Sequence, residues 1–203
     1  NYVRIGGLEV ARVGDDARML ELKRKVGQSK AYGTRASLIS AAETKEKFPL
    51  VNESEIQGAL WDPDAGLVVP RSQKVAGDLI DEAVASGALK AFPYTPATKI
   101  NVRDGKVFGV ETRRGCIATN KVVLSVGIWV PLLANQVSSP LPLTPVEHPL
   151  MFFAPYQALE GTGVEIVYPL FRDQGNSGYI RDTGDPTTTE GGRIEWGYYE
   201  TEE

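Results

Sequence analysis

The stretch Lys121-Val122-Val123-Leu124-Ser125-Val126-Gly127-Ile128-Trp129 decides the fold that we expect for this chain. Residues 121–126 form a nearly continuous apolar run, which is typical of a strand buried on both faces of a layered α/β sheet. Gly127 ends the run, and the chain then turns into a short helix. Ligands bind at the carboxyl ends of such strands, where glycine lets a group approach the backbone closely. Gly127 is therefore a candidate ligand contact, with a plain strand-to-helix turn as the alternative.

The segments around this stretch predict a mixture of helices and strands. One amphipathic helix begins at Asp15-Asp16 and is expected to end at a glycine cap, Gly27. A second helix opens with a Ser40–Glu43 capping box and stops before Pro49, and a third runs from Ser72 to Gly87. Further strands are expected at 3–10 with a break at Gly6-Gly7, and at 97–102, 106–112, 116–118, 150–154, 164–168, 178–181 and 193–199. Residues 58–70 predict a loop, and the class is α+β with a mixed sheet.

Composition excludes several kinds of partner. The net charge of -4 and the pI near 5.2 argue against nucleic acid, because phosphate binding needs a basic surface. Apolar runs stay far shorter than the roughly 20 residues of a membrane helix, so we expect no membrane partner. Cys116 is the lone cysteine, which excludes an internal disulfide and a cysteine-cluster metal site. We expect no bound metal.

Three side chains are candidates for chemistry or binding. His148 lies between Pro145 and Pro149, in a stretch that should be extended and that presents an imidazole able to titrate near neutral pH. Tyr179 and Arg181 are two residues apart on a predicted strand and therefore face the same side. Together they could bind a small carboxylate substrate. The alternatives are a solvated or core histidine and a cross-strand ion pair of Arg181.

Five stretches in the same order resemble the D-amino-acid oxidase superfamily, most of all the branch of dimethylglycine oxidase, dimethylglycine dehydrogenase and sarcosine dehydrogenase. They are residues 4–11, 58–61 with 64–70, 105–112 with Gly115, 122–129 and 143–149, and the segments 179–181 and 197–200 follow in the expected order. The resemblance covers almost the whole chain. One departure is Leu150, where the family commonly has an aromatic residue. That change bears on the shape of the substrate.

The resemblance implies an FAD cofactor and assigns roles to the candidate residues. His148 and Tyr179 would be the polar pair at the substrate amine, and Arg181 would hold its carboxylate. Gly127 and Trp129 would contact the flavin, and Ala97 the adenosine side. Residues 1–69 and 138–203 would be two parts of a substrate domain, and 70–137 part of an FAD-binding domain. The family's G-x-G-x-x-G phosphate loop is expected upstream of Asn1, so this chain alone should bind FAD weakly and lack turnover.

The activity implied is oxidation of the C–N bond of a small N-methylated amino acid, such as dimethylglycine or sarcosine, by hydride transfer to the flavin. Tetrahydrofolate is an implied partner of some members. The alternatives are another flavoenzyme of the superfamily, such as a glycine oxidase, monomeric sarcosine oxidase or glycerol-3-phosphate dehydrogenase relative, a non-catalytic binding module with the same fold, or a plain structural domain. A cytoplasmic and a mitochondrial matrix location fit the sequence equally.

Overall fold

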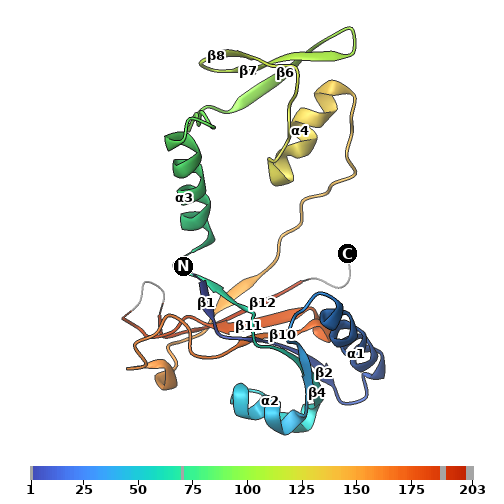
Figure 1. Cartoon of the computed structure of the whole chain (residues 1–203), viewed down its shortest axis with the longest axis vertical. Coiled ribbons are helices and arrows are strands. Elements are labelled where there is room, and N and C mark those ends of the chain that lie inside the picture. Colours follow the sequence, from blue (N-terminus) through green and yellow to red (C-terminus); the bar gives the residue numbers. More distant parts are fainter. Residues whose placement is uncertain (1, 70, 188–190, 200–203) are drawn as a thin grey trace. The chain divides into compact units, whose positions relative to one another are not determined.

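The computed structural model of the chain describes residues 2–69, 71–187 and 191–199. It contains two compact units (Figure 1). The first unit combines Asn1–Ala76 with His148–Glu203, and the second unit covers Gly77–Glu147. The predicted α+β class with a mixed sheet is confirmed. The assignment of the segments to a substrate domain and an FAD-binding domain stays a prediction.

A seven-stranded mixed sheet forms the centre of the first unit. Its strand order is β3-β4-β2-β10-β11-β12-β9, in which β2 and β10 pair in parallel and the other neighbours pair antiparallel. The strands are β2 (Gly7–Arg12), β3 (Ser37–Ile39), β4 (Ile56–Asp62), β9 (Leu150–Phe152), β10 (Leu170–Asp173), β11 (Gly178–Asp182) and β12 (Ile194–Tyr198). A separate antiparallel pair joins β1 (Tyr2–Arg4) to β5 (Gly66–Val68).

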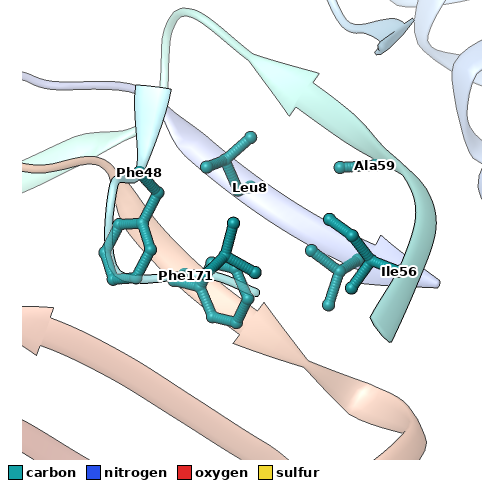
Figure 2. Packing of buried hydrophobic residues seen from close by; sticks show 7 residues of the cluster. Leu8, Phe48, Ile56, Ala59 and Phe171 are labelled. Carbon is teal, nitrogen blue, oxygen red and sulfur yellow. The ribbon is translucent and has the colours of Figure 1, made fainter. Parts of the chain in front are cut away.

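The two faces of this sheet differ in chemistry. Leu8 on β2 packs with Phe48 and Phe171 in the buried hydrophobic cluster, and the Phe48 and Phe171 rings stack at 4.8 Å (Figure 2). Phe48 is the C-cap of α2 (Ala41–Lys47), so α2 lies on this core face. The neighbouring residue, Glu9, points to the opposite face, because side chains alternate along a strand. There it contacts Lys25 of α1 (Asp16–Ala31), so α1 lies on this second, polar face.

Local sequence signals explain the beginnings and ends of several elements. Gly6 has φ +85° and separates β1 from β2, as the predicted break required. Asp15 caps α1 through the backbone N–H of Arg18, and the predicted capping box of Ser40 with Glu43 is confirmed at α2. The predicted end of α1 at Gly27 is wrong. The helix continues to Ala31, and Gly33 takes the left-handed conformation (φ +71°) after it, because a helical glycine costs only about 1 kcal/mol and does not stop a helix.

The expected loop at 58–70 is partly wrong, because β4 and β5 occupy much of it. Ala59 is fully buried between β2 and β3, and this pairing on both sides holds the segment in a sheet despite its glycines. The turn formers Pro63-Asp64-Ala65 connect the two strands, as their chemistry predicts.

The second unit contains a three-stranded antiparallel sheet, β6-β7-β8. The predicted hairpin at Asp104-Gly105 is confirmed, and both residues adopt positive φ there. The strands are β6 (Ala97–Arg103), β7 (Lys106–Thr112) and β8 (Gly115–Ala118). The helices are α3 (Ser72–Ala85), whose first residues belong to the first unit, and α4 (Val130–Ala134). Short 3-10 turns occur across the chain at Glu53–Glu55, Gly127–Trp129, Asn135–Val137, Gln157–Leu159 and Gln174–Asn176.

Two predicted strands are wrong. Residues 121–126 belong to none of the sheets that the described residues form, and Val123 is 87% exposed. A strand needs neighbouring N–H and C=O groups, and no described strand lies beside this run to supply them. Residues 164–168 are also irregular. Asp182 accepts hydrogen bonds from the N–H groups of Val167 (2.8 Å) and Tyr168 (2.7 Å), so a side chain replaces the partner strand. Strands β3 and β10 were not predicted.

Candidate functional site

The register of the sheet brings several candidate residues onto its polar face. Arg172 on β10 lies opposite Tyr179 on β11, and Tyr179 lies opposite Gly197 on β12. Gly197 in turn lies opposite Leu150 on β9, two residues after His148. Directly opposed residues of paired strands project to the same side. The polar face thus collects side chains from four neighbouring strands.

An aromatic row connects His148 to Tyr179. The His148 and Tyr199 rings meet edge to face, with centroids 4.5 Å apart. Tyr199 is also 6.0 Å from the Tyr179 ring. Sequence reasoning did not single out Tyr199 as a site residue. The signal was present, because Tyr199 follows Gly197 by two positions and therefore continues the polar face.

Tyr179 is a neutral hydrogen-bond donor at physiological pH. Partial burial is the main cause that raises the pKa of its phenol, and the nearby Tyr199 and the Glu195 carboxylate raise this pKa further. Arg181 acts in the opposite direction but does not reverse the shift. The hydroxyl can therefore orient a substrate without carrying charge.

Arg181 is paired inside the protein. Its Nε donates to Oε2 of Glu195 at 2.6 Å, and one terminal nitrogen contacts the same oxygen at 2.5 Å. Glu195 is directly opposite Arg181 on β12 and is only 5% exposed. This buried carboxylate neutralises the guanidinium. The predicted role of Arg181 in holding a substrate carboxylate stays a prediction, and a substrate would have to share the guanidinium with Glu195.

A pocket of about 490 Å³ lies in the first unit. Tyr179 and Tyr199 line it, and α1 and the segment after β10 contribute polar groups. Its polar lining residues include Arg18, Arg172, Gln174, Tyr179, Arg181 and Tyr199. This volume is in the range of small-molecule sites. The pocket borders the aromatic row and carries three arginines.

The residues expected at the cofactor lie in the second unit. Ala97, Gly127 and Trp129 are exposed, and Trp129 exposes 62% of its surface. Gly127 has φ +55°, and no atom lies within 4 Å of the position that a Cβ would take there. Open backbone beside an exposed indole fits the contact with a planar ring system. His148, Tyr179 and Arg181 lie in the first unit.

The described part of the chain forms neither a metal site nor a membrane-spanning helix. They contain no cluster of histidine, cysteine and carboxylate side chains that could hold a metal ion. None of the helices described is long and apolar enough to cross a bilayer.

Comparison with known proteins identifies the family. The family model of DAO-type FAD-dependent oxidoreductases matches residues 1–203. The chain belongs to this DAO family. Membership indicates FAD as the cofactor and oxidoreduction as the chemistry.

Curated DAO-family relatives and solved structures agree with this result. The chain is 30% identical to mitochondrial sarcosine dehydrogenase of Mus musculus over 195 residues, which is 94% of the chain and 20% of the relative. It is 28% identical to mitochondrial dimethylglycine dehydrogenase of Homo sapiens over 168 residues, 83% of the chain and 19% of the relative. A mitochondrial regulatory subunit of pyruvate dehydrogenase phosphatase from Mus musculus is 26% identical over 183 residues, 89% of the chain and 20% of the relative.

Among solved structures, L-proline dehydrogenase from P. horikoshii superposes with a TM-score of 0.77 at 23% identity. Glycine oxidase from Geobacillus kaustophilus superposes with a TM-score of 0.71 at 22% identity. Each match covers 98% of the chain, and 50% and 48% of the respective structure. These likenesses support the fold. The chain thus spans about a fifth of the curated relatives and about half of the solved chains.

Proposed function

We propose that this chain contributes the substrate-facing surface of an FAD-dependent enzyme that oxidises the C–N bond of a small N-methylated amino acid. The observation that carries the proposal is the row of His148, Tyr199 and Tyr179 beside an arginine-lined pocket. A basic imidazole, a neutral phenol and a cationic wall suit a ligand that has both an amine and a carboxylate. Relatives named sarcosine and dimethylglycine dehydrogenase support the N-methyl class.

His148 and Tyr179 would set the state of the substrate amine. Removal of hydride from the carbon next to nitrogen needs the nitrogen lone pair, so the amine must be neutral. His148 is exposed and its ring is held against Tyr199, so it can accept the ammonium proton. The Tyr179 hydroxyl would orient the nitrogen. When bound, FAD would supply the acceptor for the hydride, which carries both electrons.

The second unit would hold the flavin. Gly127 offers open backbone, and Trp129 offers an exposed indole. Ala97 is the first residue of β6 and is also exposed. No G-x-G-x-x-G occurs in the sequence, so this chain alone lacks the N–H groups that such a loop donates to phosphates. We expect the isolated chain to bind FAD weakly and to show no turnover. Flavin absorption after purification measures this, and a yellow stoichiometric complex would contradict it.

The central experiment replaces His148 by alanine in the complete gene product. We expect oxidation of sarcosine or dimethylglycine to fall by about 100-fold or more, while flavin content stays unchanged. Tyr94→Ala is the matched control, because Tyr94 is 95% exposed in the second unit. Undiminished turnover of His148→Ala would refute the proposed role. Parallel assays with glycine and glycerol 3-phosphate separate this substrate class from the other flavoenzymes of the superfamily.

A second candidate function is a non-catalytic module that retains the fold. The match to a protein named as a regulatory subunit favours it. The two candidates differ in one measurement, because a module would show no oxidation of any N-methylated amino acid by the flavin-loaded complete gene product. Tetrahydrofolate as a further partner stays a prediction, and its addition to the same assay tests it.

A further inference from the structure

We propose that Arg172 is the residue that holds the carboxylate of the substrate in this pocket. The inference rests on the proposed function and deepens it, because it assigns the recognition of the acid group to a residue that the sequence did not single out. Arg172 is the third residue of β10, lies directly opposite Tyr179, and lines the pocket.

Of the three arginines that line the pocket, only Arg172 has no carboxylate partner among the described residues. Arg18 contacts Glu21 at 2.5 Å, and Arg181 contacts Glu195 at 2.5 Å. The Arg172 side chain makes neither a hydrogen bond nor an ion pair with any described residue. A guanidinium without an internal partner can offer both of its parallel N–H groups to a ligand.

The acidic neighbour of Arg172 is already occupied. Glu9 lies beside Arg172 in the parallel register of β2 and β10. However, its Oε1 accepts from Lys25 Nζ at 2.6 Å, and Lys25 also contacts Glu21 at 3.3 Å. The ion pairs described on this face join Arg18 and Lys25 to Glu9 and Glu21, and Arg181 to Glu195. None of these pairs includes Arg172.

The wall of the pocket is complementary to an anion. Its described lining residues include three arginines and no carboxylate. Two of these arginines, Arg18 and Arg181, are already paired with Glu21 and Glu195. Arg172 therefore supplies the uncompensated positive charge of the lining.

The order of residues across the strands also orients an amino acid. Arg172 lies on one side of Tyr179, and Tyr199 and then His148 lie on the other side. A carboxylate at Arg172 directs the amine of a short amino acid toward Tyr179 and the aromatic row. The same arrangement favours amines that carry an acid group, because only these offer the guanidinium a carboxylate partner.

The test measures binding of dimethylglycine and of its amide, dimethylglycinamide, to the complete gene product by calorimetry. We expect the parent protein to prefer the acid, and Arg172→Gln to weaken binding of the acid by roughly 10- to 100-fold while binding of the amide changes little. Arg172→Lys should recover part of the loss, because it keeps the charge but not the two-pronged geometry. Arg24→Gln is the matched control, since Arg24 is an exposed arginine of α1 that does not line the pocket.

Two outcomes overturn the inference: a parent protein that binds acid and amide equally, or a folded Arg172→Gln variant that keeps the preference for the acid. Should Arg172→Gln fail to fold, the Arg172→Lys variant decides by the same comparison. The readout is separate from that of the proposed function. Carboxylate binding that depends on Arg172 in a protein without amine oxidation would defeat the proposed enzyme and support the assignment of Arg172.

Discussion

The Tyr179 ring lies directly across Gly197 of the neighbouring strand. A Cβ placed on Gly197 would be 2.1 Å from Cζ and 2.2 Å from the hydroxyl oxygen of Tyr179, which is far inside van der Waals contact. The two residues are opposite each other in the register of β11 and β12. Gly197 is therefore what allows the phenol to lie flat on the polar face.

Gly197→Ala should displace the Tyr179 ring and lower the free energy of unfolding by about 1–3 kcal/mol, as overpacking does elsewhere. Denaturant unfolding of the complete gene product measures the loss. In a Tyr179→Ala background the same substitution should cost less, because the clash is gone. Gly27→Ala is the control. It has open space in α1 and should raise stability by about 0.5–1 kcal/mol. Equal costs of Gly197→Ala in both backgrounds would contradict the clash.

Tyr199 should act as a positioning residue between His148 and Tyr179. Tyr199→Leu removes both ring contacts and is expected to lower kcat/KM for the N-methylated amino acid by about 10- to 100-fold, mostly through kcat. Tyr199→Phe keeps the ring and should retain most of the activity. Tyr198→Leu serves as control, because Tyr198 contacts Trp196 and alternates to the other face of the sheet. A Tyr199→Leu enzyme with parental kcat would argue against the aromatic row.

Asp182 should be a major structural carboxylate of the first unit. It is 1% exposed and accepts from the N–H groups of Val167, Tyr168 and Gly184 at 2.7–2.9 Å. Asp182→Ala leaves three donors without their partner and should cost about 3 kcal/mol or more in the free energy of unfolding. Asp81→Ala, at an exposed position of α3 outside the sheet, is a comparison substitution for the general effect of removing an acidic side chain. The net contribution of one hydrogen bond to stability is about 1 kcal/mol. If Asp182→Ala lowers the free energy of unfolding by less than this, the loop at 164–168 is held by other contacts.

The titration of Tyr179 should be visible at high pH. Burial raises the pKa of its phenol above the ordinary value of about 10, so the neutral form is favoured in the folded protein. The stabilising contribution is complete below the unfolded pKa and is lost as pH rises through the folded pKa. Stability measured above pH 10 should therefore fall less steeply in Tyr179→Phe than in the parent. Identical alkaline profiles would contradict this, and Tyr94→Phe controls for an exposed phenol.

Local signals in the sequence determined several elements correctly. The capping box at Ser40, the hairpin at Asp104-Gly105 and the break at Gly6 depend on one to four adjacent residues, and each is found where the sequence predicts it. Strand alternation likewise placed Tyr179 and Arg181 on one face, because that periodicity is local. The order of the expected helices and strands along the sequence was also enough to predict the α+β class, and the five stretches were enough to show the family resemblance.

Features that depend on partners distant in the chain were decided only by the tertiary structure. Residues 121–126 have the composition of a buried strand but no described strand beside them, and residues 164–168 find their acceptor in the Asp182 side chain. The pairing of charged side chains was likewise decided by the tertiary structure. The sequence shows arginines at 172 and 181, but only the β-sheet register reveals that Glu195 pairs with Arg181 while Glu9, beside Arg172, is held by Lys25. Hydrogen-bond and charge partners are a property of spatial neighbours, and a linear pattern does not contain them.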